Sequence, residues 1–201
     1  MSSPALPLIH QALRKSFQRL ESSQKVWASV LAECSPLIAS VGNLAEQLRA
    51  LSSLHLPSTP LNVFPDLEDR LRFKLLHAVD TALVRLNEQM CSLQSVRDSF
   101  SNQVSAVFQL YEQNRDSLDA STVMERSAMA PSICDMMGWL QDAERHYRQQ
   151  FVRRKALLQT LRADELSLLE SSPKRWKSLE SPSMEENITD ALDKVSFFIE
   201  E

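Results

Sequence analysis

The side chains that most readily carry out chemistry are scattered along this sequence. They are the histidines and cysteines His10, His55, His77, His146, Cys34, Cys91 and Cys134. Nucleophilic catalysis needs a Ser or Cys backed by a His that a carboxylate orients, and no motif of that kind surrounds any of them. We therefore predict that the chain is not an enzyme and that it works by binding other proteins.

The nearest approach to a metal site is Asp142 with His146, which are four residues apart on a predicted helix and so share one of its faces. Structural zinc sites use four protein ligands and catalytic ones three, so this pair falls short of a site. We interpret it as hydrogen-bonded or solvent-exposed. The 2 glycines of the chain cannot build the Gly-rich loops that hold phosphates. No metal and no cofactor is predicted.

Charge and hydropathy exclude further classes of protein. The formal net charge of -4 and the pI of about 5.6 give no global field toward nucleic acid or an anionic membrane. The longest run without Asp, Glu, Lys or Arg, residues 50–65, contains prolines and polar residues, so we expect no membrane span. An odd number of widely spaced cysteines predicts free thiols in a reducing, intracellular compartment.

Helical spacing of apolar residues predicts an all-α fold, an elongated and coiled-coil-like helical bundle with one very long central helix. Two helices at 8–31 and 36–54 are expected to form a hairpin, because Ser35 and Pro36 are typical of a helix start. Pro173 and Pro182 should bracket a brief turn that carries Trp176, before a last helix at 184–201. The predicted divisions of this one elongated domain are an N-terminal hairpin at 1–56, a Pro-rich connector at 57–65, the long helix at 66–118, a polar connector at 119–130, and C-terminal helices at 131–201.

The long helix presents more apolar surface than a compact chain of this size can easily cover. Unbroken, it would be about 80 Å long, whereas a compact fold would have a diameter of about 45 Å. Either the helix bends or breaks near residues 99–105, or the apolar stripe is partly covered by another chain, and the second alternative is favoured. The candidate partner-binding residues are Leu86, Met90, Leu93, Arg97, Phe100, Val104, Phe108 and Tyr111 on the stripe, with Trp139, Arg145, Tyr147, Phe197 and Phe198 beyond it.

A basic patch on the predicted fourth helix allows two interpretations. Its residues are Arg145, Arg148, Arg153, Arg154 and Lys155. They could contact ribosomal RNA or an acidic protein, or they could form a solvated helix face balanced by Asp142 and Glu144, which we favour. Arg97 and Arg154 lie at the edges of apolar stripes, where each could pair with a carboxylate across a helix interface.

Several short segments resemble a known family in the same order along the chain. They are Asn43-Leu44-Ala45-Glu46-Gln47-Leu48, Phe64-Pro65-Asp66-Leu67, Val107-Phe108-Gln109, Tyr111-Glu112-Gln113, Pro131-Ser132, Asp135-Met136, Trp139-Leu140-Gln141-Asp142, Glu144-Arg145-His146-Tyr147-Arg148, Val195-Ser196-Phe197-Phe198 and Glu200-Glu201. These segments are similar to the vertebrate ribosome maturation factor family AIRIM. The resemblance covers nearly the whole chain.

This resemblance implies a function that composition and spacing do not reach. It implies a non-catalytic adaptor subunit of a heteromeric AAA-type ATPase complex, together with a second small helical protein, a cyclin-dependent-kinase-2-interacting protein. The complex would act in the cytoplasm on the maturing large (60S) ribosomal subunit and release a shuttling assembly factor for recycling. A further role in protein turnover at replicating chromatin, and both cytoplasmic and nuclear localisation, are implied. The alternative is a helical protein that binds RNA or the pre-ribosome through the basic patch.

Overall fold

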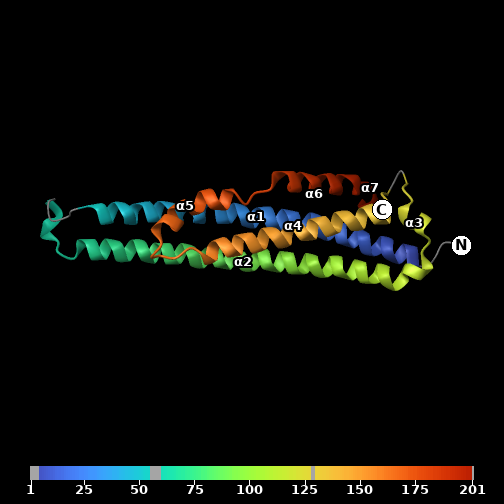
Figure 1. Cartoon of the computed structure of the whole chain (residues 1–201), viewed down its shortest axis with the longest axis horizontal. Helices are drawn as coiled ribbons and strands as arrows, with labels where there is room; N and C mark the ends of the chain where they lie inside the picture. The colour runs from blue at the N-terminus through green and yellow to red at the C-terminus, as the bar shows by residue number, and fades with distance from the viewer. Residues whose placement is uncertain (1–4, 55–59, 128–129, 201) are drawn as a thin grey trace. The chain divides into compact units, whose positions relative to one another are not determined.

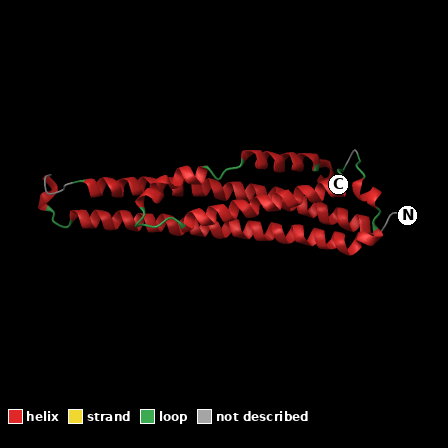
Figure 2. Ribbon diagram, viewed as in Figure 1, coloured by secondary structure: helices red, strands yellow, loops and turns green. Residues whose placement is uncertain are grey.

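The computed structural model describes residues 5–54, 60–127 and 130–200, and every regular element in these ranges is helical (Figure 2). The prediction of an all-α fold is confirmed. In chain order the elements are α1 (Ala5–Ser53), η2 (Pro60–Val63), α2 (Leu67–Asn114), η3 (Arg115–Ser117), α3 (Ala120–Met124), α4 (Ile133–Gln159), α5 (Leu166–Lys177), α6 (Pro182–Lys194) and α7 (Ser196–Glu200) (Figure 1). Residues 57–59 of the predicted connector at 57–65 lie outside the described residues, and the remainder contains η2.

The chain divides into two compact units. Unit 1 comprises Met1–Ala28, Leu93–Phe151 and Ser181–Glu201, and unit 2 comprises Ser29–Ser92 and Val152–Glu180. Helices α1, α2 and α4 contribute to both units, whereas α6 and α7 belong to unit 1 and α5 belongs to unit 2. Each unit therefore has its own packing, which can be followed from the contacts inside it.

In unit 1, α1, α2 and α4 pack around an aromatic centre. The Gln103 amide of α2 donates to the Ser16 hydroxyl of α1 over 3.1 Å, and Arg19 of α1 contacts Ser99, so these two helices run antiparallel. The ring of Tyr147 on α4 lies 5.0 Å from that of Trp27 and 5.8 Å from that of Phe100. Since the last two belong to α1 and α2, aromatic packing joins all three helices.

In unit 2, the second half of α1 and the first half of α2 pack with the end of α4 and with α5. The Gln89 amide donates to the Glu33 carboxylate over 2.9 Å, and Arg72 donates to the Ser52 hydroxyl over 3.2 Å, so the two helices are antiparallel here as well. Leu48, Leu86 and Val79 are buried between the elements of this unit. Helix α5 adds buried Leu169 and Trp176.

The predicted N-terminal hairpin is wrong, because α1 is one helix with Pro36 inside it. Proline removes the hydrogen bond to the carbonyl four residues earlier, here that of Ala32. Both residues are exposed, so that carbonyl remains open to solvent. Buried residues continue at helical spacing across the proline, at Val30, Cys34, Ile38, Val41, Ala45 and Leu48. Packing along this uninterrupted stripe offsets the local cost of about 3 kcal/mol.

The turn predicted between Pro173 and Pro182 is also corrected, because α5 includes Pro173. This proline cannot donate to the carbonyl of Leu169, and the buried Ser172 hydroxyl donates to that carbonyl instead, over 2.6 Å. The helix therefore continues to Lys177 and places Trp176 in the core, 5% exposed. The predicted last helix is divided too: α6 begins at Pro182, and α7 follows a break at Val195.

Helix α2 is continuous from Leu67 to Asn114, about 72 Å long, so it does not break near residues 99–105. The serines that lower helix propensity there make contacts between helices: Ser99 with Arg19, and Ser101 with Glu144. The favoured alternative, a stripe covered by another chain, is also corrected. This correction applies to the middle of the stripe, where Leu86, Leu93 and Phe100 are fully buried by this chain's own helices. Toward the ends of the stripe, Leu71 is exposed and Phe108 and Tyr111 are half-buried, so partial cover by another chain stays a prediction there.

Candidate partner-binding surface

The start of α4 is organised by Ser132, which is buried and immediately precedes the helix. Its hydroxyl accepts a hydrogen bond from the backbone N–H of Asp135 over 3.1 Å and donates to the Asp135 carboxylate over 2.6 Å. These bonds satisfy polar groups that a helix start leaves without an intrahelical partner. They also fix the first turn of α4. Trp139 lies four residues after Asp135, on the same face of the helix.

The carboxylate of Asp135 also binds the segment before α4. The Arg126 guanidinium donates to it through Nε over 2.8 Å and through Nη2 over 3.1 Å. Hydrogen bonds from Arg126 and Ser132 hold the pKa of the Asp135 carboxyl below its ordinary value. The carboxylate is thus ionised at neutral pH and tethers the preceding segment to α4 by a two-pronged charge-assisted contact.

The break between α6 and α7 places Phe197 and Phe198 opposite the start of α4. The N–H of Val195 donates to the carbonyls of Ala191 and Leu192, both over 3.2 Å, and the backbone then turns. Phe198 points inward, where its ring packs edge-on against His10 with centroids 5.6 Å apart. Phe197 points outward and is 64% exposed.

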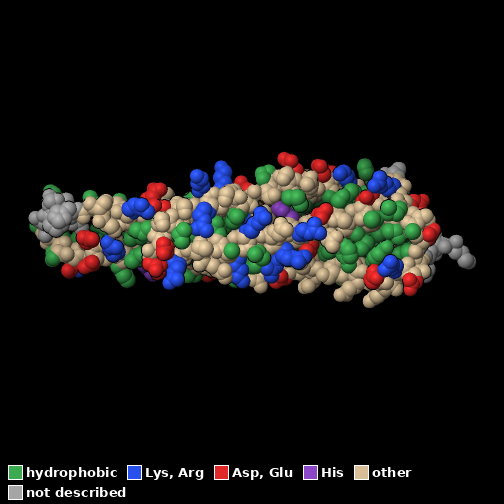
Figure 3. Space-filling model, viewed as in Figure 1, with side chains coloured by type: hydrophobic (Ala, Val, Ile, Leu, Met, Phe, Trp, Pro, Cys, Tyr) green, Lys and Arg blue, Asp and Glu red, His purple; other side chains and the backbone are tan. Residues whose placement is uncertain are grey.

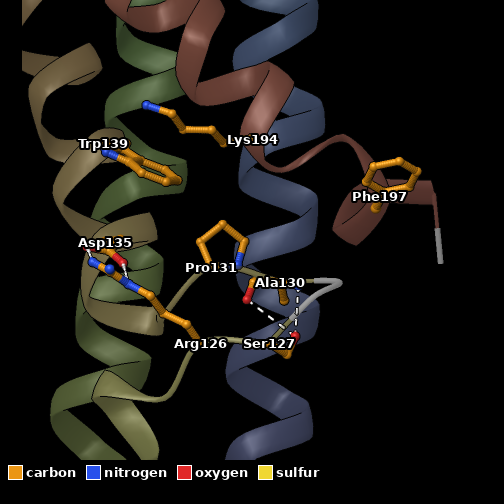
Figure 4. Close-up of a pocket in the computed structure, with 8 residues that line it drawn as sticks. All are labelled: Arg126, Ser127, Ala130, Pro131, Asp135, Trp139, Lys194 and Phe197. Carbon is orange, nitrogen blue, oxygen red and sulfur yellow. Dashed lines mark hydrogen bonds and ion pairs between the residues drawn. The ribbon is translucent and has the colours of Figure 1, made fainter.

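A cleft of about 410 Å³ lies between these walls, and we call it the Trp139 cleft (Figure 4). It is lined by Arg126, Ser127, Ala130, Pro131, Asp135, Trp139, Lys194 and Phe197. Lys194 Nζ lies 5.5 Å from the centroid of the Trp139 ring, a cation–π contact between α6 and α4. A second cleft of about 380 Å³ continues between α4 and α6 on the other side of this pair and shares both residues.

Comparison with known proteins adds the family. Residues 7–197 match the sequence model of a family described as "Ribosome biogenesis protein C1orf109-like". The chain belongs to this family. It is 46% identical to a protein of Danio rerio over 100% of this chain and 99% of that one, and 42% identical to a protein of Homo sapiens over 96% of each. A protein of Xenopus tropicalis is 40% identical, over 97% of this chain and 96% of the relative. Each of the three is named "AFG2-interacting ribosome maturation factor".

In this C1orf109-like chain, many of the predicted partner-binding residues lie in the core. They are at most 7% exposed and are Leu86, Met90, Leu93, Phe100, Val104, Tyr147 and Phe198. As candidate contacts for a partner they are corrected, because the chain's own helices cover them. Helical spacing alone could not separate the two roles, since a core stripe and a coiled-coil seam share the same period.

The remaining candidates reach the surface to different extents. Phe197 is exposed and Trp139 half-buried in the Trp139 cleft, whereas Phe108 and Tyr111 are half-buried on α2. Among the described residues, Arg97 of α2 pairs with no carboxylate on another helix. Its Nε donates to the adjacent Asp98 over 2.8 Å, and its guanidinium lies 4.1 Å from the centroid of the Phe151 ring.

The predicted basic patch of this C1orf109-like protein is smaller than its sequence suggests. Arg154 is 1% exposed, with its guanidinium 5.2 Å from the centroid of the Trp176 ring, so it is removed from the patch. Arg145 pairs with Asp142 over 3.2 Å, and Arg148 pairs with Glu144. On the face drawn in Figure 3, Lys and Arg side chains are dispersed among acidic ones. The favoured interpretation, a solvated helix face balanced by Asp142 and Glu144, fits these pairs.

His146 and Asp142, the pair considered above as metal ligands, have structural contacts instead. His146 is buried, and its ring packs edge-on against Tyr147 with centroids 5.6 Å apart, whereas Asp142 is exposed and pairs with Arg145. These two residues therefore do not converge on a common site. In the ranges that the structure describes, no group of three or more His, Cys, Asp or Glu could hold a metal ion.

One exposed group was missed by the sequence-based predictions and lies in unit 2. We call it the hairpin-end patch: between 39% and 71% exposed, its residues are Leu54, Leu61, Val63, Phe64, Leu71 and Phe73. They flank the end of α1, η2 and the start of α2. The sequence signal was the apolar run that includes Leu61, Val63 and Phe64 beside the Pro-rich connector.

One described helix passes a test for a membrane span by length and composition. In α1, an 18-residue window has a mean hydropathy of 1.3 with no more than two Asp, Glu, Lys or Arg residues, and 33% of it is buried inside the structure. The core helix of a soluble protein passes the same test. The expectation that the chain does not cross a membrane therefore stays a prediction.

Proposed function

We propose that this protein is a non-catalytic adaptor that binds an AFG2-type AAA ATPase during maturation of the ribosome. The observation that carries this proposal is the match over essentially the whole chain, at 40–46% identity, to relatives named as AFG2-interacting ribosome maturation factors. The match covers between 96% and 100% of this chain and so includes both units. The nucleotide-driven step would belong to the ATPase.

The stage of maturation and the other partners form the finer part of the proposal. The chain would act on the cytoplasmic large (60S) subunit and promote the release and recycling of a shuttling assembly factor. A second small helical protein, the cyclin-dependent-kinase-2-interacting protein, would join the same complex. Action at replicating chromatin would add a nuclear location to the cytoplasmic one. The sequence resemblance supports each of these points.

The surface chemistry supports an adaptor. An adaptor needs two separate contact areas, and each unit exposes one: the Trp139 cleft in unit 1 and the hairpin-end patch in unit 2. Both contain exposed aromatic side chains, which are enriched at the energetic centres of protein interfaces. Exposed apolar groups of this kind mark interaction sites more often than isolated exposed leucines do.

The direct test is reconstitution from purified components. The full chain, an AFG2-type ATPase and the helical partner would be mixed in pairs and together, and complexes measured by size-exclusion chromatography with light scattering. We expect a stable complex of the chain with the ATPase. With pre-60S particles and ATP, we expect release of the assembly factor to depend on this chain. A chain that stays a monomer with both proteins would contradict the proposal.

A further inference from the structure

The Trp139 cleft combines an apolar surface with an uneven distribution of charge. Pro131, Trp139 and Phe197 supply apolar surface, and Phe197 projects into solvent at the edge of the cleft (Figure 4). Two cations, Arg126 and Lys194, line the cleft with one carboxylate, Asp135. The lining therefore carries one excess positive charge.

That excess charge resides on Lys194. Arg126 is already bound by Asp135 through both Nε and Nη2, so its charge is compensated within the chain. Lys194 contacts the face of the Trp139 ring, and among the described residues it forms no ion pair with a carboxylate. A cation on an aromatic face keeps its N–H groups free to donate to an anion that arrives from solvent.

We propose that the Trp139 cleft binds an acidic segment of the AFG2-type ATPase, with an apolar side chain against Trp139 and Phe197 and a carboxylate at Lys194. This inference rests on the proposed function, because it names the partner of that function as the occupant. The apolar contact provides affinity, since a buried aromatic anchor dominates binding at small interfaces. The positive charge of Lys194 selects an acidic segment and speeds its approach.

Charge complementarity favours this occupant over the others that an apolar cleft could take. A basic segment would place its cations beside Lys194, where like charges repel. A wholly apolar segment would cover Lys194 without supplying a counter-ion, which costs free energy when a charge is desolvated. Near the hairpin-end patch, Arg70 and Arg72 are paired with Asp66 and Glu68.

The experiment measures binding of the full chain to the purified ATPase by isothermal titration calorimetry at low and high salt. Phe197→Ser and Lys194→Glu change exposed positions, so both variants should fold normally, as circular dichroism would verify. The matched controls are Val84→Ser and Lys177→Glu, an exposed apolar position and an exposed lysine of unit 2 that lie outside the hairpin-end patch. We expect affinity to fall about tenfold or more for Phe197→Ser. For Lys194→Glu we expect a similar loss that shrinks at high salt.

The outcomes separate the site from the function. If the wild-type chain does not bind the ATPase, the proposed function itself fails. If it binds and the Trp139 cleft variants bind as tightly as the controls, the function stands and the cleft assignment is overturned. If Phe197→Ser weakens binding but Lys194→Glu does not at any salt concentration, the acidic character of the segment is overturned. Selective loss in both cleft variants supports the proposal.

Discussion

The ring of Pro173 lies directly against the α-carbon of Gly42. A Cβ at position 42 would come within 2.8 Å of Pro173 Cγ and 3.1 Å of Cδ, closer than carbon atoms normally approach. Gly42 is buried in α1, and Pro173 belongs to α5, so this contact joins α1 to α5 within unit 2. The missing side chain of the glycine makes room for the proline ring.

We expect Gly42→Ala to destabilise the protein although alanine favours helix. Replacing glycine within a helix normally gains about 0.5–1 kcal/mol, but overpacking against a rigid ring costs about 1–3 kcal/mol. Urea unfolding should show a net loss of free energy of unfolding of about 1 kcal/mol. The matched control is Gly138→Ala in α4, where an added Cβ meets nothing within 4 Å. That variant should be stabilised, and equal effects at the two positions would contradict the contact.

The sequence predicts features that depend on the spacing of nearby residues better than features that depend on contacts between distant residues. The apolar positions of the first helix, Ile9, Leu13, Phe17, Leu20 and Trp27, are all buried as their spacing indicates. Helix continuity through Pro36 and Pro173 could not be read locally. In both helices, the packing that offsets the proline comes from elements distant in sequence, such as Gly42 against Pro173.

The candidate site shows the same limit. Trp139 and Phe197 could be chosen as aromatic residues, but their placement in one cleft depends on the break at Val195 and on the tether from Arg126 to Asp135. Neither contact has a local sequence signature. The burial of Arg154 could not be predicted either. A run of basic residues indicates an exposed helix face, and only the packing of α5 places Trp176 against Arg154.

Cys34 should differ sharply from the other two cysteines in reactivity. Burial raises the pKa of the Cys34 thiol to about 11, whereas Cys91 and Cys134 are exposed. Only the thiolate reacts, and at pH 8 about one Cys34 in a thousand would be ionised even if a reagent could reach it. Titration of the native protein with a thiol-reactive dye should label two cysteines quickly and the third only after unfolding. Rapid labelling of all three would contradict the packing of unit 2.

Glu144 should make stability depend on pH in the acidic range. Burial raises the pKa of its carboxyl, but hydrogen bonds from Arg148 and Ser101 outweigh that effect, and the pKa lies below its ordinary value. The unfolded state therefore binds more protons near pH 4, so this contribution is present at neutral pH and is lost as pH falls through the folded-state pKa. Glu144→Gln should be less stable at pH 7, and the difference from wild type should narrow toward pH 3.

The control for this measurement is Glu88→Gln, at an exposed position of α2. Urea unfolding at several pH values would be compared for wild type and both variants. A difference for Glu144→Gln that stays constant from pH 7 to pH 3 would show that the carboxylate charge plays no part. The effect would then come from altered packing alone.

The basic face of α4 should contribute little to any binding of RNA. Arg154 is buried, Arg145 and Arg148 pair with acidic residues of α4, and Arg153 and Lys155 are two further exposed members of the predicted patch. We expect the double change Arg153→Glu and Lys155→Glu to leave association with pre-60S particles unchanged between about 50 and 200 mM salt. Each lost phosphate contact would instead lower the slope of log affinity against log salt by about 0.7–0.9. A weaker, less salt-dependent association of this variant would restore direct RNA binding as the better explanation.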